Sequence, residues 1–279
     1  KDLQGMDQIR DNVFFVHTSS SRYVLKGFGS ERKLQAQKTL TKKLRKNGFR
    51  KTYRFIDDIP SFYYRGEIYQ FIEFLNGSDH EFTYHSRFNR EEGMDLLDDF
   101  HRATGTFSKD LFISEFDQVK KWEERIKEFS SYADEISRYV PDDYIEEWLS
   151  WGRWGLDGLK KYENRFYDER SCIVHGDVAY HNFFRKRSGS LYLIDFDLIS
   201  KGPPIIDFLQ YANRIMPHIS GTEELFSYKQ LNRYRGNKAF LYALVFPTDI
   251  FREWNRLMRL GVDKSELRSV WKLSVDRWQ

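Results

Sequence analysis

Two short apolar segments that each run into an acidic residue constrain this chain most strongly. The segment Cys172–Val174 leads through a His-Gly pair to Asp177, and the segment Leu191–Ile194 leads directly to Asp195. Asn182 lies five residues after Asp177 and thirteen residues before Asp195. Short apolar runs bounded by polar turns are typical of buried strands. We therefore expect two strands to bring these three polar side chains to one place.

The tripeptide His-Gly-Asp at residues 175–177 and the Ile-Asp-Phe-Asp at residues 194–197 carry a family resemblance. They closely resemble the catalytic and metal-binding loops of kinase-fold small-molecule phosphotransferases, the aminoglycoside phosphotransferase and choline kinase group. Phosphoryl transfer needs a carboxylate beside the attacking hydroxyl, and an amide oxygen and a carboxylate that hold Mg²⁺. The resemblance implies ATP and Mg²⁺ as cofactors, with Asp177 as the catalytic residue and with Asn182 and Asp195 as metal ligands.

Three more residues lie close to these loops in the sequence. Asp197 is either a second metal ligand or a turn acid, and the sequence leaves both interpretations open. We interpret His175 as a structural histidine that braces the loop, rather than as a base or a ligand. Asp207 resembles the family's second acid after the metal loop, which implies a buried carboxylate that hydrogen-bonds the catalytic loop backbone.

Two other interpretations of the 172–197 stretch compete with this resemblance. In the first, the acids only form turns at the ends of two buried strands. In the second, His175, Asp177 and Asp195 bind the metal of a hydrolase. Metal hydrolases usually supply more histidine ligands or a His-Glu-x-x-His helix, and the sequence contains no such helix motif. The hydrolase is therefore the weaker of the two alternatives.

A narrower resemblance comes from three other stretches. The Phe-His-x-Ala at residues 100–103 resembles bacterial spore-coat kinase-like (CotS-type) members of the same group. The basic run at residues 42–49 and the Ile-Asp-Phe-Asp stretch support the same subfamily. The resemblance implies a cytoplasmic protein that is associated with the spore.

The N-terminal part supplies the nucleotide-binding candidates. Lys26 ends a Tyr-Val-Leu-Lys strand, the position from which a kinase lysine contacts the α- and β-phosphates. Glu73 and Leu75 end a later apolar strand, where the family binds adenine through backbone groups.

This part also departs from the ordinary kinase pattern. The helical segment that follows Lys26 has Glu31 as its only acid near the start, where its simplest role is to favour the helix dipole. Gln35 or Gln37 would face Lys26 in its place. The loop that should cover the phosphates falls at residues 5–10 and contains a single glycine.

The pattern predicts an α+β, bilobal, protein-kinase-like fold. Residues 1–75 form a nucleotide-binding N-lobe, a small mixed β-sheet with one helix, and residues 76–279 form a mainly helical C-lobe with the catalytic loop, the metal loop and the acceptor site. The expected strands cover residues 12–16, 22–26, 53–56 and 68–74, and the N-lobe helix covers residues 30–46. The expected C-lobe helices cover residues 90–104, 117–129, 142–167 with a break at Gly152 or Gly155, 205–215, 228–246 and 248–260, with a last one from residue 264.

Composition limits the partners and the compartment. The 279 residues contain 45 basic and 42 acidic side chains, a net charge of +3, which is too balanced to indicate nucleic acid or membrane binding. The single cysteine, Cys172, excludes an intrachain disulfide and favours a reducing, cytoplasmic interior. The start at Lys1 rather than at Met leaves room for a further strand upstream.

These observations favour an ATP- and Mg²⁺-dependent phosphotransferase that moves the γ-phosphate to a hydroxyl of a small-molecule acceptor. The rival hypothesis is a pseudokinase, or a spore-coat-type structural protein, that keeps the kinase fold and binds partners. Two features support the rival hypothesis: the helix after Lys26 has no suitable glutamate to pair with it, and the expected phosphate-covering loop at residues 5–10 has a single glycine. The acceptor is left open among aminoglycosides, choline, ethanolamine, sugars and methylthioribose-like compounds.

Overall fold

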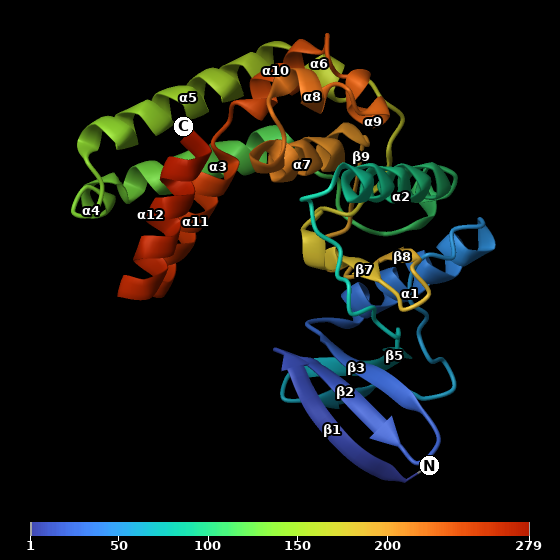
Figure 1. The fold of residues 1–279 in the computed structure, drawn as a ribbon. Coiled ribbons are helices and arrows are strands. Elements are labelled where there is room, and N and C mark those ends of the chain that lie inside the picture. Colours follow the sequence, from blue (N-terminus) through green and yellow to red (C-terminus); the bar gives the residue numbers. More distant parts are fainter. Residues whose placement is uncertain (1, 279) are drawn as a thin grey trace. The chain divides into compact units, whose positions relative to one another are not determined.

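The computed structural model describes residues 2–278, which divide into two compact units (Figure 1). The first unit contains the residues up to Glu115 together with Arg170–Asp207, and the second contains Phe116–Glu169 and the residues from Phe208 onward. The predicted change from strands to helices near residue 76 lies inside the first unit. The predicted lobe boundary at residues 75 and 76 stays a prediction.

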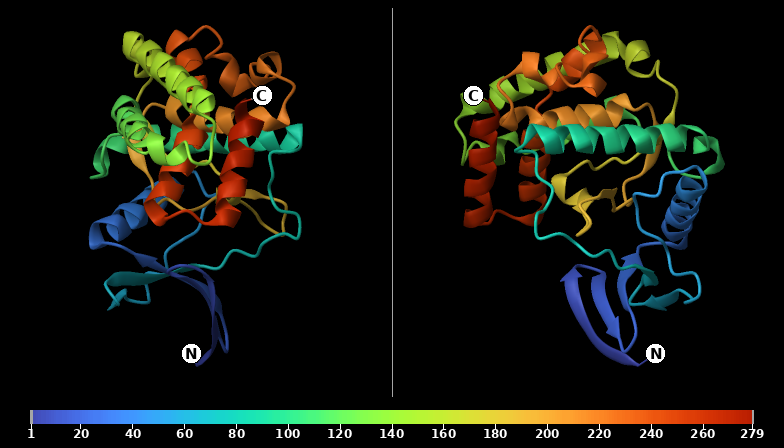
Figure 2. Two further views of the ribbon diagram at one scale, coloured as in Figure 1. Left: turned by 90° about the vertical axis from the view of Figure 1, so that its left-hand side faces the viewer. Right: turned by 45° about the vertical axis from the view of Figure 1, so that its right-hand side comes forward.

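A five-stranded sheet opens the first unit, in the order β1-β2-β3-β5-β4. Every pairing is antiparallel, where the sequence predicted a mixed sheet. Figure 2 shows the curved ribbon of its first strands in blue from two further directions. The strands are β1 (Leu3–Arg10), β2 (Val13–Thr18), β3 (Arg22–Phe28), β4 (Phe62–Tyr64) and β5 (Glu67–Glu73).

Two N-terminal predictions were wrong. The segment 5–10, expected as a phosphate-covering loop, belongs to β1, and the chain reverses at Asp11 and Asn12 instead. Asn12 has φ 57°, a left-handed conformation that asparagine tolerates better than most residues. The strand expected at residues 53–56 makes only the isolated bridge between Phe55 and Ile72. Strand β4 was not predicted, because all three of its side chains are exposed and its sequence shows no alternation of apolar and polar residues.

The helix of this unit, α1 (Glu31–Lys46), follows the prediction closely. The Ser30 side chain accepts a hydrogen bond from the Lys33 amide at 3.3 Å, which caps the first turn. Asn47 closes the helix, and Gly48 continues at φ 87°, a usual way to end one. Its buried face consists of Leu34, Gln37, Leu40, Thr41 and Leu44.

The rest of the first unit joins one long helix to two antiparallel strand pairs. The helix α2 (Arg87–Gly105) packs against β6 and β8. Its Thr104 hydroxyl accepts a hydrogen bond from the Ile173 amide at 3.2 Å, which fixes β6 to the helix. The elements are η1 (Ser108–Asp110), β6 (Cys172–Val174) paired with β9 (Ser200–Gly202), η2 (Tyr180–Asn182), and β7 (Phe183–Arg185) paired with β8 (Leu191–Leu193).

The second unit is helical. In this unit α5 packs against α10 and α3, and α11 packs against α3 and α12. The helix α7 begins in the first unit, whose last residue is Asp207, and continues into the second unit. The helices are α3 (Gln118–Ser131), α4 (Ala133–Ile136), α5 (Asp142–Lys161), α6 (Glu163–Phe166), α7 (Ile205–Ile215), η3 (Met216–His218), α8 (Thr222–Leu225), α9 (Lys229–Asn232), α10 (Lys238–Leu244), α11 (Thr248–Leu260) and α12 (Lys264–Trp278).

Two helical predictions needed correction. The helix α5 runs unbroken through Gly152 and Gly155, because these glycines serve packing: a Cβ on Gly155 would meet the Tyr242 carbonyl oxygen at 3.0 Å. The single helix expected over residues 228–246 is two, and Asn237 caps the second by accepting from the Phe240 amide. The α+β fold class is confirmed. None of the helices in the described residues is both long and apolar enough to cross a bilayer.

Candidate functional site

Three of the residues singled out in the sequence meet in an ion-pair cluster within the first unit. Lys26 lies in β3, between β2 and β5, and its side chain is almost fully buried. Its Nζ lies 2.9 Å from Asp195 Oδ1 and 2.7 Å from Asp197 Oδ1. A buried ammonium therefore holds both carboxylates of the Ile-Asp-Phe-Asp stretch.

Arg10 completes this cluster, and the sequence did not indicate it. It is the last residue of β1, and its Nη2 donates to Asp195 Oδ2 at 2.6 Å. Each oxygen of Asp195 is thus bonded to a different cation. Burial would raise the pKa of Asp195, but Lys26 and Arg10 outweigh it and hold that pKa well below its ordinary value. The carboxylate is therefore ionised throughout the neutral range.

The α1 helix contributes Gln37, one of the two glutamines considered as a partner of Lys26 in place of a glutamate. Gln37 Nε2 donates to Asp197 Oδ1 at 2.7 Å, the oxygen that also accepts from Lys26. Its Oε1 accepts from the buried Tyr53 hydroxyl at 3.1 Å. Burial raises the pKa of Tyr53 well above its ordinary value, and the charges of the two nearby aspartates raise it further. Gln37 thus supports the cluster through Asp197 rather than through Lys26.

The other two N-terminal helix candidates lie elsewhere. Glu31 is exposed at the start of α1, where it accepts from Gln35 Nε2 at 2.7 Å and from the Tyr63 hydroxyl at 3.3 Å. Within residues 2–278, neither Glu31 nor Gln35 forms a hydrogen bond or an ion pair with Lys26. Helix spacing would have favoured Gln37, since it shares the buried face of α1.

The His-Gly-Asp turn is fixed by a carboxylate from α7. Asp207 accepts from the His175 amide at 2.6 Å and from the Gly176 amide at 2.9 Å. Gly176 has φ 79°, and a Cβ there would lie 2.4 Å from the Leu198 carbonyl oxygen. Only glycine fits this position, which gives a physical reason for the second residue of the motif.

A histidine from α2 supports Asp207 in turn. His101 Nε2 donates to Asp207 Oδ2 at 2.8 Å, and both side chains are buried. Burial would raise the pKa of Asp207, but the hydrogen bond and the charge of His101 outweigh it and lower that pKa. The Phe-His-x-Ala stretch therefore has a structural counterpart, the histidine that pairs with the loop-anchoring aspartate.

The ring of His175 joins the two loops. Its Nε2 donates to the Ile194 carbonyl oxygen at 2.9 Å, and its Nδ1 accepts from the Asp177 amide at 3.3 Å. Because both ring nitrogens are engaged, His175 is unsuited to bind a metal. Within the described residues no group of three or more His, Cys, Asp or Glu side chains is placed to hold a metal ion. The hydrolase alternative therefore has no support in the geometry.

Asp177 and Asn182 form a second contact pair on the loop. Asn182 Nδ2 donates to the backbone oxygen of Asp177 at 2.9 Å and to its Oδ2 at 3.1 Å. The backbone carbonyl oxygen of Asn182 accepts a hydrogen bond from the Ile194 amide at 3.0 Å, which connects the loop to the residue before Asp195. Because the side-chain nitrogen is turned to Asp177, the Oδ1 of Asn182 is the atom that can bind a cation.

These oxygens suit Mg²⁺ by their chemistry. Magnesium prefers oxygen ligands and is usually bound through one or two carboxylates with substrate phosphates. Asp195, Asp197 and Asn182 supply two carboxylates and an amide oxygen, and the two carboxylates already attract cationic groups. Asp195 also has φ 68°, a strained conformation for a residue with a side chain, and such strain often marks a functional position.

The adenine candidates lie at the end of β5. The Glu73 amide donates to the Arg54 carbonyl oxygen at 2.7 Å, and its carboxylate lies 3.2 Å from Arg54 Nε. Leu75 follows two residues after the end of the strand. Backbone groups beyond Glu73 are therefore outside the sheet ladder, where a planar ring could bind them.

Comparisons with known proteins agree with this geometry. The sequence profile of a family described as "Phosphotransferase enzyme family" matches residues 5–240. No curated protein shows significant sequence similarity to the chain.

Several solved structures have the same fold at low identity. An aminoglycoside phosphotransferase from Alicyclobacillus acidocaldarius is 17% identical with a TM-score of 0.76, over 98% of this chain and 88% of that one. The choline kinase LicA from Streptococcus pneumoniae is 16% identical with a TM-score of 0.56, over 99% and 93%. The macrolide 2'-phosphotransferase MphH from Brachybacterium faecium is 11% identical with a TM-score of 0.61, over 96% and 90%. Other solved structures of this fold hold AMP, GDP or ADP. At these identities the likeness shows the fold.

Proposed function

Because this chain belongs to the phosphotransferase enzyme family, we propose that it moves the γ-phosphate of ATP to a hydroxyl of a small molecule, with Mg²⁺ as cofactor. The observation that carries the proposal is the cluster of Lys26, Asp195 and Asp197, hydrogen-bonded through the backbone to the loop of Asp177 and Asn182. The nucleotides bound by proteins of similar fold support ATP as the donor.

In this proposal Asp195 changes partners when nucleotide binds. The structure pairs Asp195 with Lys26 and Arg10. Both cations would turn to the phosphates, and Asp195, with Asn182 and Asp197, would become free to bind Mg²⁺. The magnesium ion, when bound, neutralises negative charge on the phosphate oxygens. Arg10 then performs by charge what a glycine-rich loop performs with backbone amides.

Asp177 would orient the acceptor hydroxyl and receive its proton. The Asn182 side chain holds one carboxylate oxygen of Asp177 at 3.1 Å, so the orientation of Asp177 is set before substrate arrives. The Asp207 contacts fix the same turn from the backbone side. Catalysis would come mainly from positioning and electrostatic stabilisation, since the transition state of phosphoryl transfer is loose.

The finer assignments are part of the same proposal. Residues 1–75 and the loops of residues 175–197 would bind the nucleotide, with Glu73 and Leu75 next to the adenine. Residues in the helical remainder, 76–279, would bind the acceptor. A cytoplasmic location, spore association and membership of the CotS-type subfamily remain predictions from the sequence.

A pseudokinase is the second candidate, and Gln37 favours it. This residue replaces a charged partner by a neutral amide and engages Asp197, the proposed second metal ligand. A protein of this kind would bind nucleotide, or only a partner, without turnover.

Two measurements separate the candidates. The first is the melting temperature with ATP, with and without Mg²⁺, since ligand at a hundredfold its Kd adds about 2.7 kcal/mol of stability. The second is a screen of hydroxyl compounds for ADP release. The proposal expects stabilisation by Mg²⁺-ATP and ADP release with at least one acceptor. Stabilisation without turnover across choline, ethanolamine, sugar and aminoglycoside acceptors would favour the pseudokinase, and no stabilisation would contradict nucleotide binding.

A further inference from the structure

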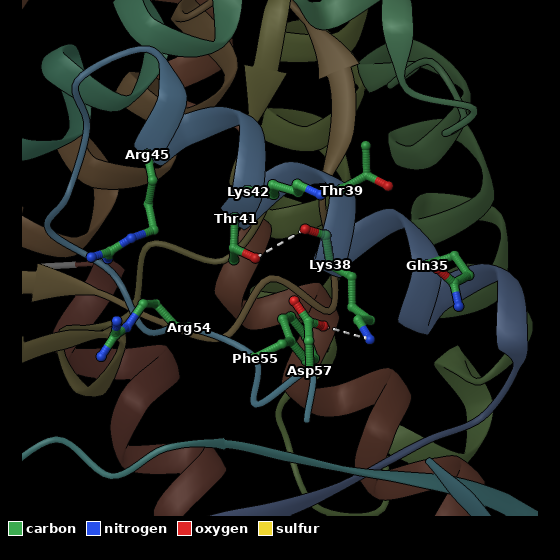
Figure 3. Close-up of a pocket in the computed structure, with 9 residues that line it drawn as sticks. All are labelled: Gln35, Lys38, Thr39, Thr41, Lys42, Arg45, Arg54, Phe55 and Asp57. Atoms are coloured by element: carbon green, nitrogen blue, oxygen red, sulfur yellow. Dashed lines mark hydrogen bonds and ion pairs between the residues drawn. The ribbon is translucent and has the colours of Figure 1, made fainter. Parts of the chain in front are cut away.

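A basic hollow lies on the outer side of α1, apart from the cluster described above (Figure 3). Its volume is about 340 Å³, and it is bounded by α1 and by residues 54–57. This volume falls at the small end of the range of small-molecule sites. Its charged lining consists of Lys38, Lys42, Arg45, Arg54 and Asp57.

The α1 residues of this hollow share one face of the helix. Lys38, Lys42 and Arg45 are spaced by four and three residues, which places them above one another on the helix surface. Gln37 is buried, donates to Asp197 and does not line the hollow. The hollow and the proposed nucleotide site therefore share no residue, although both are built on α1 and Thr41, which lines the hollow, donates to the Gln37 backbone oxygen.

The hollow carries a surplus of positive charge. Four cationic side chains and one carboxylate give a formal charge of +3 from +4 and −1. Asp57 pairs with Lys38 at 2.8 Å, and Arg54 uses its Nε for the contact with Glu73, which leaves its terminal nitrogens directed elsewhere. Within residues 2–278, the structure gives Lys42 and Arg45 no ion pair. In Figure 3 the Arg45 and Arg54 side chains extend to the same side of the hollow.

The basic run at residues 42–49 contributes only some of its side chains to this hollow. Lys43 belongs to the same run but turns away, where its Nζ pairs with Asp110 at 2.6 Å. Lys42 and Arg45 instead line the hollow, together with Thr39 and Phe55. The run thus supplies one structural ion pair and two cations whose charge is available to a ligand.

We propose that this hollow is a second binding site, for a small molecule that carries a doubly or more highly charged phosphate group. Guanidinium groups match phosphate oxygens with paired hydrogen bonds, and lysine adds a point charge. Arg45 and Arg54, which extend to the same side, supply the guanidinium groups for the phosphate, and Lys42, which extends to another part of the hollow, adds to its positive charge. The partly apolar wall of Phe55 suits a phosphate ester with an organic part.

The test uses inorganic pyrophosphate as the probe in calorimetric titrations at low and at moderate salt. The hollow variant is Lys42→Gln/Arg45→Gln, which removes two charges and keeps good helix formers. The matched control is Lys33→Gln/Lys46→Gln, which removes two charges from exposed positions of the same helix outside the hollow. The hollow variant is expected to bind about tenfold more weakly or worse, and the control within about twofold of the wild type.

Amide chemical shifts locate the bound probe. Shifts concentrated in residues 38–45 and 54–57 support the proposal, whereas shifts confined to Arg10, Lys26 and residues 175–197 place pyrophosphate only at the nucleotide site and overturn it. Equal weakening in both double variants shows general charge attraction and also overturns it. Unchanged binding by the hollow variant, or no binding by the wild type, has the same consequence. None of these outcomes depends on whether the protein transfers phosphate.

Discussion

Asp195 and Asp207 are aspartates of the same unit, both largely removed from water, that satisfy their charge in opposite ways. Asp207 accepts from two backbone amides and from a buried histidine. Asp195 accepts from the tips of two long cationic side chains, one of which is half exposed. The pKa of each carboxyl lies below its ordinary value, with burial opposing the shift in both.

The difference shows which carboxylate can change partners. Backbone amides of a tight turn cannot move away without loss of the local fold, so the contacts of Asp207 are permanent. Lysine and arginine side chains can rotate to a new partner at the cost of a few torsions. Asp207 therefore holds the loop, whereas the contacts of Asp195 allow the exchange of cations that we propose.

The largest expected effect is that of a substitution at Asp177, which neither holds the loop as Asp207 does nor changes partners as Asp195 does. Asp177→Asn should lower turnover by about two to four orders of magnitude, the usual contribution of positioned proton transfer. The change is nearly isosteric, so ATP affinity and the melting temperature should stay close to those of the wild type. Steady-state ADP release with an identified acceptor measures the effect. Full activity in this variant would show that Asp177 only shapes the turn.

The next effect separates Asp207 from Asp195 in stability. Asp207→Asn should lower the free energy of unfolding by about 3–5 kcal/mol, because it breaks a buried charge network while the partners stay buried. Urea denaturation measures this loss. Asp195→Asn is the matched control and should lose less than about 2 kcal/mol, since Lys26 keeps Asp197 as a partner. Equal losses in the two variants would remove the distinction between permanent and exchangeable contacts.

A smaller effect separates the two cations that hold Asp195. Lys26→Met should weaken ATP binding by about tenfold to a hundredfold, while AMP binding changes by less than about threefold, because AMP lacks the β-phosphate that Lys26 is proposed to contact. Arg10→Gln should weaken ATP binding by roughly fivefold, since its half-exposed side chain is screened by water. Fluorescence titrations with both nucleotides measure this. If AMP and ATP lose affinity equally, Lys26 supports the fold and not the phosphates.

The smallest effect is the pH dependence of stability. The folded-state pKa values of Asp195 and Asp207 are both lowered, so their contribution is present above the ordinary aspartate pKa and is lost as pH falls through the folded values. Stability of the wild type should therefore decline below about pH 5, and Asp207→Asn should decline less steeply. Urea denaturation at several acidic pH values provides the slopes. Parallel slopes would mean that Asp207 does not bind fewer protons in the folded state.

The sequence predicted the parts of the site that depend on local spacing. The intervals between Asp177, Asn182 and Asp195 sufficed to bring the two loops together, because a strand leads into each of them. Lys26 was singled out because the expected strand ended there, although β3 continues to Phe28. The helix expected over residues 30–46 also agrees with α1 within one residue.

Contacts between residues that lie far apart along the chain could not be predicted from the sequence. Arg10 and Asp195 are 185 positions apart, and no pattern in a single sequence links them. Gln37 was one of two glutamines considered, and only the buried face of α1 decides between them. The edge strand β4 and the true position of the first turn were missed because exposed strands carry no alternation of apolar and polar residues.

The central claim, that Asp195 exchanges Lys26 and Arg10 for magnesium when ATP binds, is tested most directly by calorimetric titration of ATP with and without Mg²⁺. The test variant is Asp195→Asn, because asparagine tolerates the left-handed backbone at this position. The wild type should bind ATP at least about tenfold more tightly with Mg²⁺ than without it, as expected for a metal that bridges carboxylate and phosphate. The variant should stay folded and lose that difference. An Asp195→Asn variant that keeps the full magnesium dependence would contradict the account.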